Sequence, residues 1–405
     1  MEKRHAPVLR LKGFTDDWEQ RKLGSIVCDY SEKNPVDEDL PILTSSRQGI
    51  QKQEEHFGSE QRHDTIDYNV IPRGYCTYRN RSDDRTFTFN VNDCIERGIV
   101  SKFYPVFSID NGNAKFVTEY LNNNFEIKNK LAVLSVGTSQ VVLSLNNLKS
   151  LDIQIPSKDE QEKIGGYFNS FDSLITLHQR KLEKLQNIKK AMLEKMFPKN
   201  EEKTPKIRFS GFTSDWEQRK LRELGKALSG VGFPDEEQGG KEGIPFYKVS
   251  DMNNAGNEQE MVTANNYVTS EQIARKRWKP IDEVPAIFFA KVGAAVLLNR
   301  KRLCRFPFLF DNNTMAYLMN KNVFDADFAK TLFETIDLTS LVQVGALPSY
   351  NAGDVEGIEV SIPKMEEQQK IGFFFINIDH LIALHQRKLE KLQNIKKAML
   401  EKMFV

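Results

Sequence analysis

The sequence predicts an α+β protein in which two globular α/β domains are joined by two long helices that form an antiparallel coiled coil. Three observations support this prediction. The stretch LHQRKLEKLQNIKKAMLEKMF occurs twice, letter for letter, at residues 177–197 and 384–404. Its apolar residues recur in alternating steps of four and three, which is the heptad spacing of a helix that packs against another helix. A second repeat opens each half of the chain, so the protein has a pseudo-twofold internal repeat.

The heptad pattern predicts which side chains form the seam between the helices. Its spacing is palindromic, so the seam suits an antiparallel pair. The pairs that this register predicts are Leu182–Leu392, Leu185–Leu389 and His178–Lys396. A stagger of one heptad is an alternative register, and packing of each stripe on its own neighbouring domain is an alternative arrangement. The predicted coiled-coil residues are Ile175, Leu182, Leu185 and Met192 in the first helix and Ile382, Leu389, Leu392 and Met399 in the second; Phe171, Lys189, Met196, Ile378, His385 and Met403 extend the two seams.

Length and composition set limits on the architecture. A chain of 405 residues is too long for one hydrophobic core, and its 40% hydrophobic content suits globular folding. The net charge is +1, so a surface that binds nucleic acid has to be a local patch. The predicted segments are a first domain with its head motif at 1–156, a first long helix at 157–198, a second domain with its head motif at 199–363 and a second long helix at 364–405.

The termini and the cysteines carry no sign of export or of a metal site. The first residues, MEKRHAPVLR, contain no apolar run, and no stretch reaches the length of a membrane-spanning helix. We therefore expect a cytoplasmic protein without membrane contact. The four cysteines form no C-x-x-C pair and the six histidines show no ligand spacing, so we expect neither a disulfide framework nor a bound metal.

Each half opens on the same head motif, GFTDDWEQRKL in the first half and GFTSDWEQRKL in the second. Thr15 or Asp16 is predicted to cap a short helix that begins with W-E-Q-R-K-L. Trp18 and Trp216 are predicted to be buried anchors of the two motifs.

Strand patterns dominate the segment that follows the first head motif. CTYRN and TFTFNV alternate like strands, GIVSKFYPVFSI indicates a turn followed by a buried strand, and LDIQIP is a closing strand. LAVLSVG fits either a strand or the end of a helix. The next segment, from Lys158 to Met196, is predicted to be one helix about 60 Å long, with Ser157 as its cap and a kink at Gly165 and Gly166.

The second half repeats this plan, but its insert does not match the first insert in sequence. A faint exception is VGTSQ at 136–140 against VGALPSY at 344–350, which both precede the closing strand. Two nearly identical frames suggest that each half presents the same surface to the same kind of partner. Two different inserts suggest that each half recognises something different.

Motifs of catalysis are absent from the sequence. QGGKEG lacks the hydroxyl residue that a P-loop requires after its lysine, and no glycine-rich dinucleotide turn follows a strand. There is no N-P-P-[FY] or D-P-P-Y, and no Ser/His/Asp order stands out. The acidic run at 37–39 is interpreted as a solvated loop. We therefore expect no catalytic residue and no cofactor in this chain.

Residues suited to nucleic-acid recognition are grouped in both inserts. Arginine offers two parallel donors for guanine or phosphate, and glutamine can bind adenine through two hydrogen bonds. In the first insert the candidates are Arg73, Tyr75, Tyr78, Arg79, Arg81 and Arg85, then Ser101, Lys102 and Tyr104, then Thr138, Ser139 and Gln140. In the second insert they are Arg275, Lys276, Arg277, Trp278, Lys291, Asn299, Arg300, Lys301, Arg302, Asn312, Asn313, Ser349, Tyr350 and Asn351. Any one run is compatible with a solvated face, but the ensemble favours DNA, because phosphate contacts give affinity and a few base contacts give sequence choice.

The chain resembles the specificity (S) subunit of type I restriction-modification enzymes. The resemblance is carried by the two head motifs, by GIVSKFYPVF, by IPSKDEQEKIG and IPKMEEQQKIG before the helices, and by the identical helix pair, and it covers essentially the whole chain. It implies that each insert is a target recognition domain that reads one half of a split DNA sequence in the major groove, and that the coiled coil sets the spacing between the halves. The second insert has VGALPSYN where the first has VGTSQVVLS, so a glutamine contact is not carried over to the second domain.

The resemblance also implies partners and cofactors outside this chain. Two modification (methyltransferase) subunits would carry S-adenosylmethionine and methylate adenine, and restriction subunits would use ATP and Mg²⁺ for translocation and cleavage. The chain itself would be non-catalytic. Two alternatives remain at this stage: a stand-alone regulatory or structural DNA-binding protein, and a protein–protein scaffold that binds no nucleic acid.

Overall fold

The computed structural model describes residues 7–35, 39–47, 49–58, 65–199, 202–342 and 347–404. The chain forms two compact units, which are described separately. Unit 1 consists of Met1–Gln179 and Arg387–Val405, and unit 2 consists of Arg180–Gln386. This grouping differs from the four consecutive segments that the sequence predicts, because each long helix begins in one unit and ends in the other.

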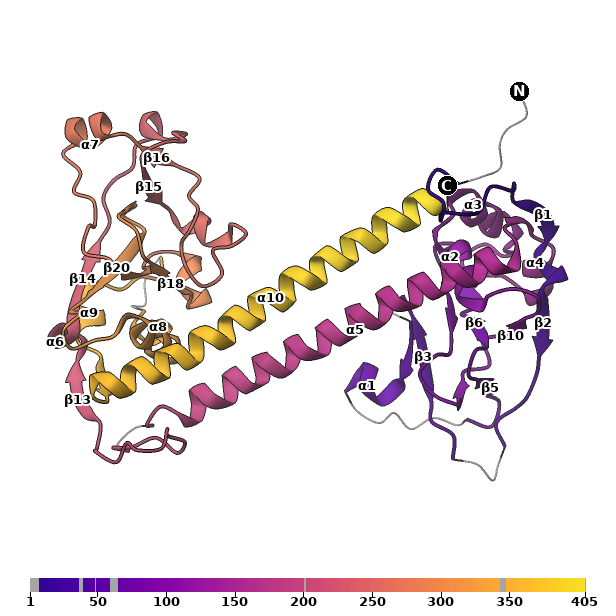
Figure 1. The fold of residues 1–405 in the computed structure, drawn as a ribbon, viewed down its shortest axis with the longest axis horizontal. Coiled ribbons are helices and arrows are strands. Elements are labelled where there is room, and N and C mark those ends of the chain that lie inside the picture. The colour runs from indigo at the N-terminus through magenta and orange to yellow at the C-terminus, as the bar shows by residue number, and fades with distance from the viewer. Residues whose placement is uncertain are drawn as a thin grey trace. The chain divides into compact units, whose positions relative to one another are not determined.

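Unit 1 is built around a four-stranded sheet with the order β2–β10–β6–β8, of which Figure 1 labels β2, β10 and β6. All of its neighbouring strands are antiparallel, and the register pairs Val106 with Tyr30 and Phe107 with Cys76. The strands are β2 (Val27–Tyr30), β6 (Cys76–Tyr78), β8 (Phe89–Val91) and β10 (Val106–Ile109). The predicted strands in CTYRN, TFTFNV and YPVFSI are therefore confirmed.

Unit 2 has a four-stranded sheet with the order β14–β20–β17–β18, again with antiparallel neighbours. Its strands are β14 (Gly225–Ser229), β17 (Ala286–Ala290), β18 (Lys301–Cys304) and β20 (Thr314–Met319). In both sheets the last strand in sequence lies between the first and the second. The two inserts therefore share a topology, although their sequences do not match.

Smaller elements complete each unit. In unit 1 these are β1 (Glu19–Lys22), β3 (Leu43–Ser46), β4 (Gly49–Lys52), α1 (Gln53–Phe57), β5 (Asn69–Pro72), β7 (Arg81–Ser82), β9 (Arg97–Val100), α2 (Ala114–Asn123), α3 (Phe125–Leu134), β11 (Val141–Val142), α4 (Leu145–Lys149) and β12 (Asp152–Ile155). In unit 2 these are β13 (Glu217–Lys220), α6 (Leu221–Leu224), β15 (Ile244–Tyr247), β16 (Tyr267–Val268), α7 (Ser270–Lys276), β19 (Leu309–Phe310), α8 (Ala326–Thr335), α9 (Ala352–Glu356) and β21 (Glu359–Ile362), with short 3-10 turns between them. LAVLSVG is the end of a helix, α3, followed by a loop.

The head motifs are strands, so the predicted short helix at W-E-Q-R-K-L is wrong, and neither Thr15 nor Asp16 caps one. β1 pairs with β12, and β13 pairs with β21 in the same way. The reason is tertiary: the closing strand, more than 100 residues away in sequence, offers an unpaired edge, and its backbone hydrogen bonds outweigh the local helix propensity of E-Q-R-K. Only a single turn after each motif is helical.

The segment just before each head motif is anchored on the start of a long helix. Arg10 forms two hydrogen bonds with the buried carboxylate of Glu160, at 2.8 and 2.7 Å, and Arg208 binds Glu367 in the same way. Bidentate pairs of this kind are directional as well as strong. Trp18 and Trp216 are buried, as predicted.

The long helices are α5 (Lys158–Lys195) and α10 (Met365–Met403). The two sets of predicted seam residues are buried or half-buried, whereas the flanking residues Leu174 and Leu177 are 44% and 45% exposed. Within unit 1, Lys396 of α10 binds Asp172 of α5 at 2.6 Å, and the rings of Phe404 and Phe168 are 5.9 Å apart. Residue numbers rise on one helix as they fall on the other, so the two segments are antiparallel.

Unit 2 contains the equivalent antiparallel pairing. Lys189 of α5 binds Asp379 of α10 at 2.6 Å, and the rings of Phe197 and Phe375 are 6.1 Å apart. These pairs establish the antiparallel coiled coil within each unit. The predicted leucine pairs join residues of different units and stay a prediction, as does the pair of His178 and Lys396. The ion pairs of Lys396 are with Asp172 and Glu119.

Gly165 serves close packing, and α5 continues through it and Gly166 as one helix. The kink predicted there stays a prediction. A Cβ atom at Gly165 would lie 2.1 Å from the side-chain oxygen of Asn113, the residue that caps α2. A Cβ atom at Gly372 in α10 would lie 2.6 Å from the backbone nitrogen of Phe328 in α8. The glycines therefore let the cap of a domain helix touch the long helix.

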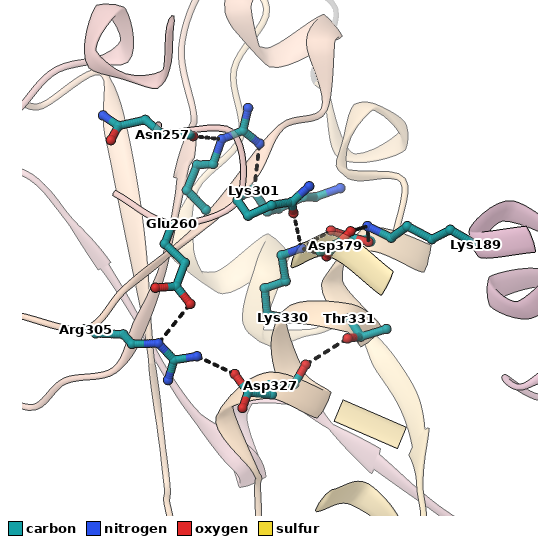
Figure 2. A network of polar contacts seen from close by, with 12 residues as sticks. Lys189, Asn257, Glu260, Lys301, Arg305, Asp327, Lys330, Thr331 and Asp379 are labelled. Carbon is teal, nitrogen blue, oxygen red and sulfur yellow. Dashed lines mark hydrogen bonds and ion pairs between the residues drawn. The ribbon is translucent and has the colours of Figure 1, made fainter. Parts of the chain in front are cut away.

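Buried charges hold a domain helix against both long helices in each unit. Charge cluster 1 consists of Lys115 and Glu119 of α2, Asp172 of α5 and Lys396 of α10. Charge cluster 2 consists of Lys330 and Glu334 of α8, Asp379 of α10 and Lys189 of α5. In Figure 2, Lys330 and Lys189 approach Asp379 from different helices. Since every cation has an acidic partner, these buried groups are compensated.

No helix in the described ranges is long and apolar enough to cross a bilayer. Among the same residues, no group of three or more histidine, cysteine or acidic side chains is arranged to hold a metal ion.

Candidate nucleic-acid interface

In unit 1 the fold brings two predicted recognition segments together. Strand β7, which begins at Arg81, pairs with β11, so the run from Arg79 to Arg85 adjoins the loop from Thr138 to Gln140. The amide of Gln140 donates to Asp83 at 3.2 Å, and all three loop residues are exposed. The two segments therefore form one polar edge of the domain, called here reading edge 1.

Two arginines of reading edge 1 are available to a ligand. Arg79 is exposed and makes no hydrogen bond or ion pair with any residue that the structure describes. Arg81 lies over the ring of Phe103, 4.1 Å from its centroid, which holds the guanidinium in place by cation–π attraction. Sequence reasoning missed Phe103, although it lies between the candidates Lys102 and Tyr104; its aromatic character among polar neighbours was the available signal.

Arg85 has a bracing role in the structure. Its backbone is left-handed, with φ of 62°, and its guanidinium donates to the carbonyl oxygens of Ala132 and Gly137 at 3.1 and 3.2 Å. Gly137 begins the loop that carries Thr138 and Gln140. Arg85 is therefore predicted to act on DNA through this loop.

The remaining candidates of unit 1 have protein partners. Arg73 binds Glu96 at 2.6 Å, and Lys102 binds Asp67 at 3.1 Å. Both pairs are largely exposed, so exchange of the acid for a phosphate would cost little. Ser101, Tyr75 and Tyr104 are half-buried, and Tyr75 packs against the ring of Tyr30 at 4.7 Å.

The prediction that Tyr78 contacts DNA is wrong. Its side chain is 0% exposed and its hydroxyl donates to the carbonyl of Leu143 at 2.9 Å. Burial raises the pKa of this phenol well above its ordinary value. All three residues of β6 are buried, so both faces of this strand are covered, and alternation in the sequence could not mark one face as solvent-exposed.

In unit 2 three predicted residues meet at the end of β17. The amide of Lys291 donates to the carbonyl of Asn313 at 2.9 Å, and Val292 forms a β-bridge with Ser349. The ammonium of Lys291 donates to the hydroxyl of Ser229 at 3.0 Å. Asn312 and Asn313 are both exposed. This set, called here reading edge 2, occupies the same place in its sheet as reading edge 1, because β17 and β6 are equivalent strands.

The basic run at the end of α7 contains residues with protein partners and one exposed residue without an ion pair among the described residues. Arg275 donates to both oxygens of Glu237 at 2.8 and 2.7 Å, which lowers the pKa of this carboxyl to about 2, and Lys276 approaches Glu236 and Glu237 at 3.4 Å. Trp278 packs on the ring of Phe246 at 5.1 Å. Arg277 is exposed and forms no ion pair in the described part of the chain. Of this run, Arg277 is the best placed to meet a ligand.

The run from Asn299 to Arg302 is mostly internal, which corrects the prediction of a DNA contact there. Lys301 is 4% exposed and donates to the side chain of Asn299 at 2.7 Å and to the carbonyl of Ile336 at 2.6 Å. Arg302 is half-buried and donates to Asn257, and Arg300 binds Asn253 at 2.8 Å. Strand β18 is the last strand of its four-stranded sheet, and its outer edge is bridged by the segment around Glu260. Lys301 and Arg302 therefore donate to the carbonyl groups of Ile336 and Asn257 in place of solvent.

Tyr350 is also wrong as a DNA contact, since it is 5% exposed and its hydroxyl donates to the carbonyl of Ala290. Asn351 caps α9 with its side chain. The faint echo between VGTSQ and VGALPSY falls partly outside the described residues, because 343–346 are not among them.

Lys301 yields a testable pH dependence. Burial lowers its pKa from 10.5 to about 8, so the folded state disfavours the charged form. A folded pKa below the unfolded one means that charged Lys301 costs stability below pH 8, and that this cost fades as the pH rises toward 10.5. The free energy of unfolding of the wild-type chain is expected to rise over this window relative to that of Lys301→Met. Equal pH dependence of the two chains, measured by denaturant unfolding, would contradict the assignment.

The comparison with known proteins agrees with this geometry. Residues 15–187 and 213–394 match the family described as type I restriction modification DNA specificity domain. The chain belongs to this family. The two matches cover most of the chain, and each takes in one head motif, one insert and most of one long helix.

Relatives and a solved structure lead to the same family. The MjaVIII type I restriction enzyme specificity subunit of Methanocaldococcus jannaschii is 24% identical over 278 residues, which are 62% of this chain and 61% of that protein. The MjaIX specificity subunit of the same organism is 25% identical over 303 residues, or 71% of this chain and 68% of that protein. The match therefore spans less than two thirds of the first relative. The crystal structure of a type I restriction-modification S subunit from M. genitalium has the same fold, with a TM-score of 0.67, 15% identity and 99% of each chain covered.

Proposed function

We propose that this chain is the DNA specificity subunit of a type I restriction-modification complex. Each unit reads one half of a bipartite DNA sequence through its reading edge, and the coiled coil sets the length of the unread spacer. One observation carries the proposal: two inserts of unrelated sequence share one topology and present different polar side chains at the same place in their sheets. A frame repeated within the chain, with different side chains at one edge of each sheet, is what two readers of different base sequences require.

The chemistry belongs to other subunits in this proposal. Two modification subunits, which bind S-adenosylmethionine, dock on the repeated frame and methylate adenine, and restriction subunits use ATP and Mg²⁺ to move and cut DNA. This chain directs them and is itself non-catalytic. Such a complex works on the cell's own DNA and on incoming DNA in the cytoplasm.

Methylation mapping tests the proposal directly. Genomic DNA from cells with and without the gene is expected to differ in adenine methylation at one split sequence, with two specified halves and an unspecified spacer between them. Unchanged methylation, together with failure of methyltransferase chains to co-purify with the protein, would favour a stand-alone DNA-binding protein.

Lengthening both helices tests the spacer claim within the same experiment. A heptad inserted after Gln179 in α5 and another after Gln386 in α10 occupy equivalent positions of the repeat and leave the residues of each unit unchanged. Seven residues add about 10 Å of helix, which corresponds to about three base pairs of duplex. The methylated sequence is expected to keep both halves and to gain about three base pairs of spacer. The same spacer in both strains would contradict the role of the helices.

A further inference from the structure

A buried tyrosine ties the end of the central strand to the loop before the closing strand in unit 1. Tyr78 is the last residue of β6, and its hydroxyl donates to the carbonyl of Leu143 at 2.9 Å. Leu143 directly precedes Ser144, which caps α4. The amide of Leu143 in turn donates to the carbonyl of Asn80 at 2.9 Å, so the contact has two hydrogen bonds.

Unit 2 has the same link, but here the tyrosine belongs to the loop and the acceptor carbonyl belongs to the strand. Tyr350 directly precedes Asn351, which caps α9, and its hydroxyl donates to the carbonyl of Ala290 at 2.5 Å. Ala290 is the last residue of β17. The amide of Tyr350 donates to the carbonyl of Lys291 at 3.3 Å, which again gives two hydrogen bonds.

The two ties join equivalent positions. Strands β6 and β17 occupy the same place in their sheets, and α4 and α9 both precede the closing strand of their units. In unit 1 the hydroxyl comes from the strand, and in unit 2 it comes from the loop. The two inserts have unrelated sequences, yet in both a tyrosine hydroxyl links the end of the central strand to the loop before the closing strand. This indicates that the link has the same role in both units.

Each of these hydrogen-bonded links fixes the reading edge of its unit. The residue after the strand end is basic in both units, Arg79 in unit 1 and Lys291 in unit 2. The polar loop residues Gln140 and Ser349 lie just before the tied loop position. With the tie in place, a basic side chain and a polar loop are fixed beside each other; without it, the loop gains freedom relative to the strand.

We propose that Tyr78 and Tyr350 are positioning residues for DNA reading, each of which fixes one reading edge and thereby the base choice in one half of the DNA sequence. The inference rests on the proposed function. It assigns the two tyrosines, which are buried and cannot touch DNA, to specificity through the geometry of their loops. A ligand-reading loop must be held to within a fraction of an ångström, and a buried hydrogen bond to a backbone carbonyl provides this constraint.

The test uses tyrosine-to-phenylalanine variants of the full chain expressed with its partner subunits. Phenylalanine keeps the ring, which in Tyr78 packs against Phe89 at 4.8 Å and in Tyr350 against Phe289 at 6.4 Å, and removes only the hydroxyl. Tyr317→Phe is a matched control, because Tyr317 is 0% exposed and its hydroxyl donates to the carbonyl of Leu221 at 2.7 Å, away from the reading edge.

Methylation is then mapped at the cognate sequence and at sequences that differ from it by one base. In Tyr78→Phe the ratio of cognate to mismatched methylation is expected to fall about three- to tenfold for changes in one half only, and in Tyr350→Phe for changes in the other half only. Tyr317→Phe is expected to lower the melting temperature by a similar amount and to leave both ratios unchanged.

Several results would overturn the inference. Unchanged ratios in both tyrosine variants, relaxation of both halves by one variant, or equal relaxation in Tyr317→Phe would each do so. Loss of all methylation in a variant would also do so, because the hydroxyl would then be a requirement of folding. Failure of the proposed function is distinguishable, since the wild-type chain would then produce no split methylated sequence at all.

Discussion

Truncation of Phe404 to alanine is expected to destabilise unit 1 by about 3–5 kcal/mol, the range for removal of a buried aromatic ring. Phe404 is 2% exposed, and its ring lies within 6 Å of the rings of Phe116, Tyr120 and Phe168. The large effect follows because the end of α10 completes the core of unit 1.

The identical repeat allows the same substitution at an equivalent residue in the other unit. Phe197 has the same preceding 20 residues as Phe404, but its ring packs against Trp216, Phe328 and Phe375 in unit 2. Phe197→Ala is therefore expected to destabilise unit 2 by a similar amount. Two residues with one local sequence would thus act on different units.

Hydrogen exchange measured by mass spectrometry separates the two units. Phe404→Ala is expected to speed exchange in β2 and β10, and Phe197→Ala in β14 and β20. Phe373, 69% exposed on α10, gives the control, and Phe373→Ala is expected to change exchange little. Faster exchange in unit 2 after Phe404→Ala, with unit 1 unaffected, would show that the assignment of the helix ends is wrong.

Replacement of Asp379 by asparagine is expected to cost unit 2 about 3–5 kcal/mol, because it leaves an uncompensated positive charge in charge cluster 2. The side chains of Lys189 and Lys330 are 14% and 9% exposed, and both bind Asp379. With Asp379 gone, Glu334 is the one carboxylate left for two ammonium groups. Denaturant unfolding of the variant and the wild-type chain measures the difference.

A second substitution tests the cause. Lys189→Met added to Asp379→Asn restores the balance of one cation and one anion, and it is expected to recover a large part of the lost stability. Glu366→Gln, an exposed acid in the first turn of α10, is the control and is expected to cost less than about 1 kcal/mol. If the single and double variants lose the same free energy of unfolding, the effect comes from a lost hydrogen bond and not from an uncompensated buried charge.

The same clusters set a pH window for stability. Burial raises the pKa of Glu334, but Lys330 and Lys189 outweigh it, so the pKa lies below 4.5; for Asp172, Lys115 and Lys396 have the same effect and the pKa lies below 3.8. A depressed carboxyl pKa contributes stability above the unfolded value, and this contribution is lost as the pH falls through the folded value. The pKa of Lys189 is raised above 10.5 by Glu334 and Asp379 against the effect of burial, so its contribution is lost at high pH. The clusters therefore stabilise both units between about pH 4.5 and 10.5.

Local periodicity predicted much of the fold. The heptad residues from Ile175 to Met192 and from Ile382 to Met399 are buried or half-buried, as their spacing predicts, because residues three and four apart share one face of a helix. The strands in CTYRN and LDIQIP were equally readable. At the reading edges, Arg79, Arg81, Gln140 and Lys291 were found from residue type, although their roles on DNA stay a prediction.

Other predictions required partners that lie far away in sequence. E-Q-R-K was misread as helix, because its strand partner is more than 100 residues downstream. Tyr78, Tyr350 and Lys301 carry polar groups that suit a DNA surface, yet their acceptors are buried carbonyls supplied by other segments. In the sequence, the two charge clusters are visible only as the i,i+4 pairs Lys115–Glu119 and Lys330–Glu334, which are a weak indication of a buried cluster.

The sequence by itself determined the two-part plan of this protein: twin helices with one heptad seam, twin head motifs and two unlike inserts, because repeats and periods are properties of the chain. Only the tertiary structure decided that the inserts share one topology, that each helix ends in the core of the other half's unit, and which polar side chains are inside. Those outcomes depend on which backbone and side-chain groups meet across long stretches of chain, and a buried polar group is stable only where such a partner exists.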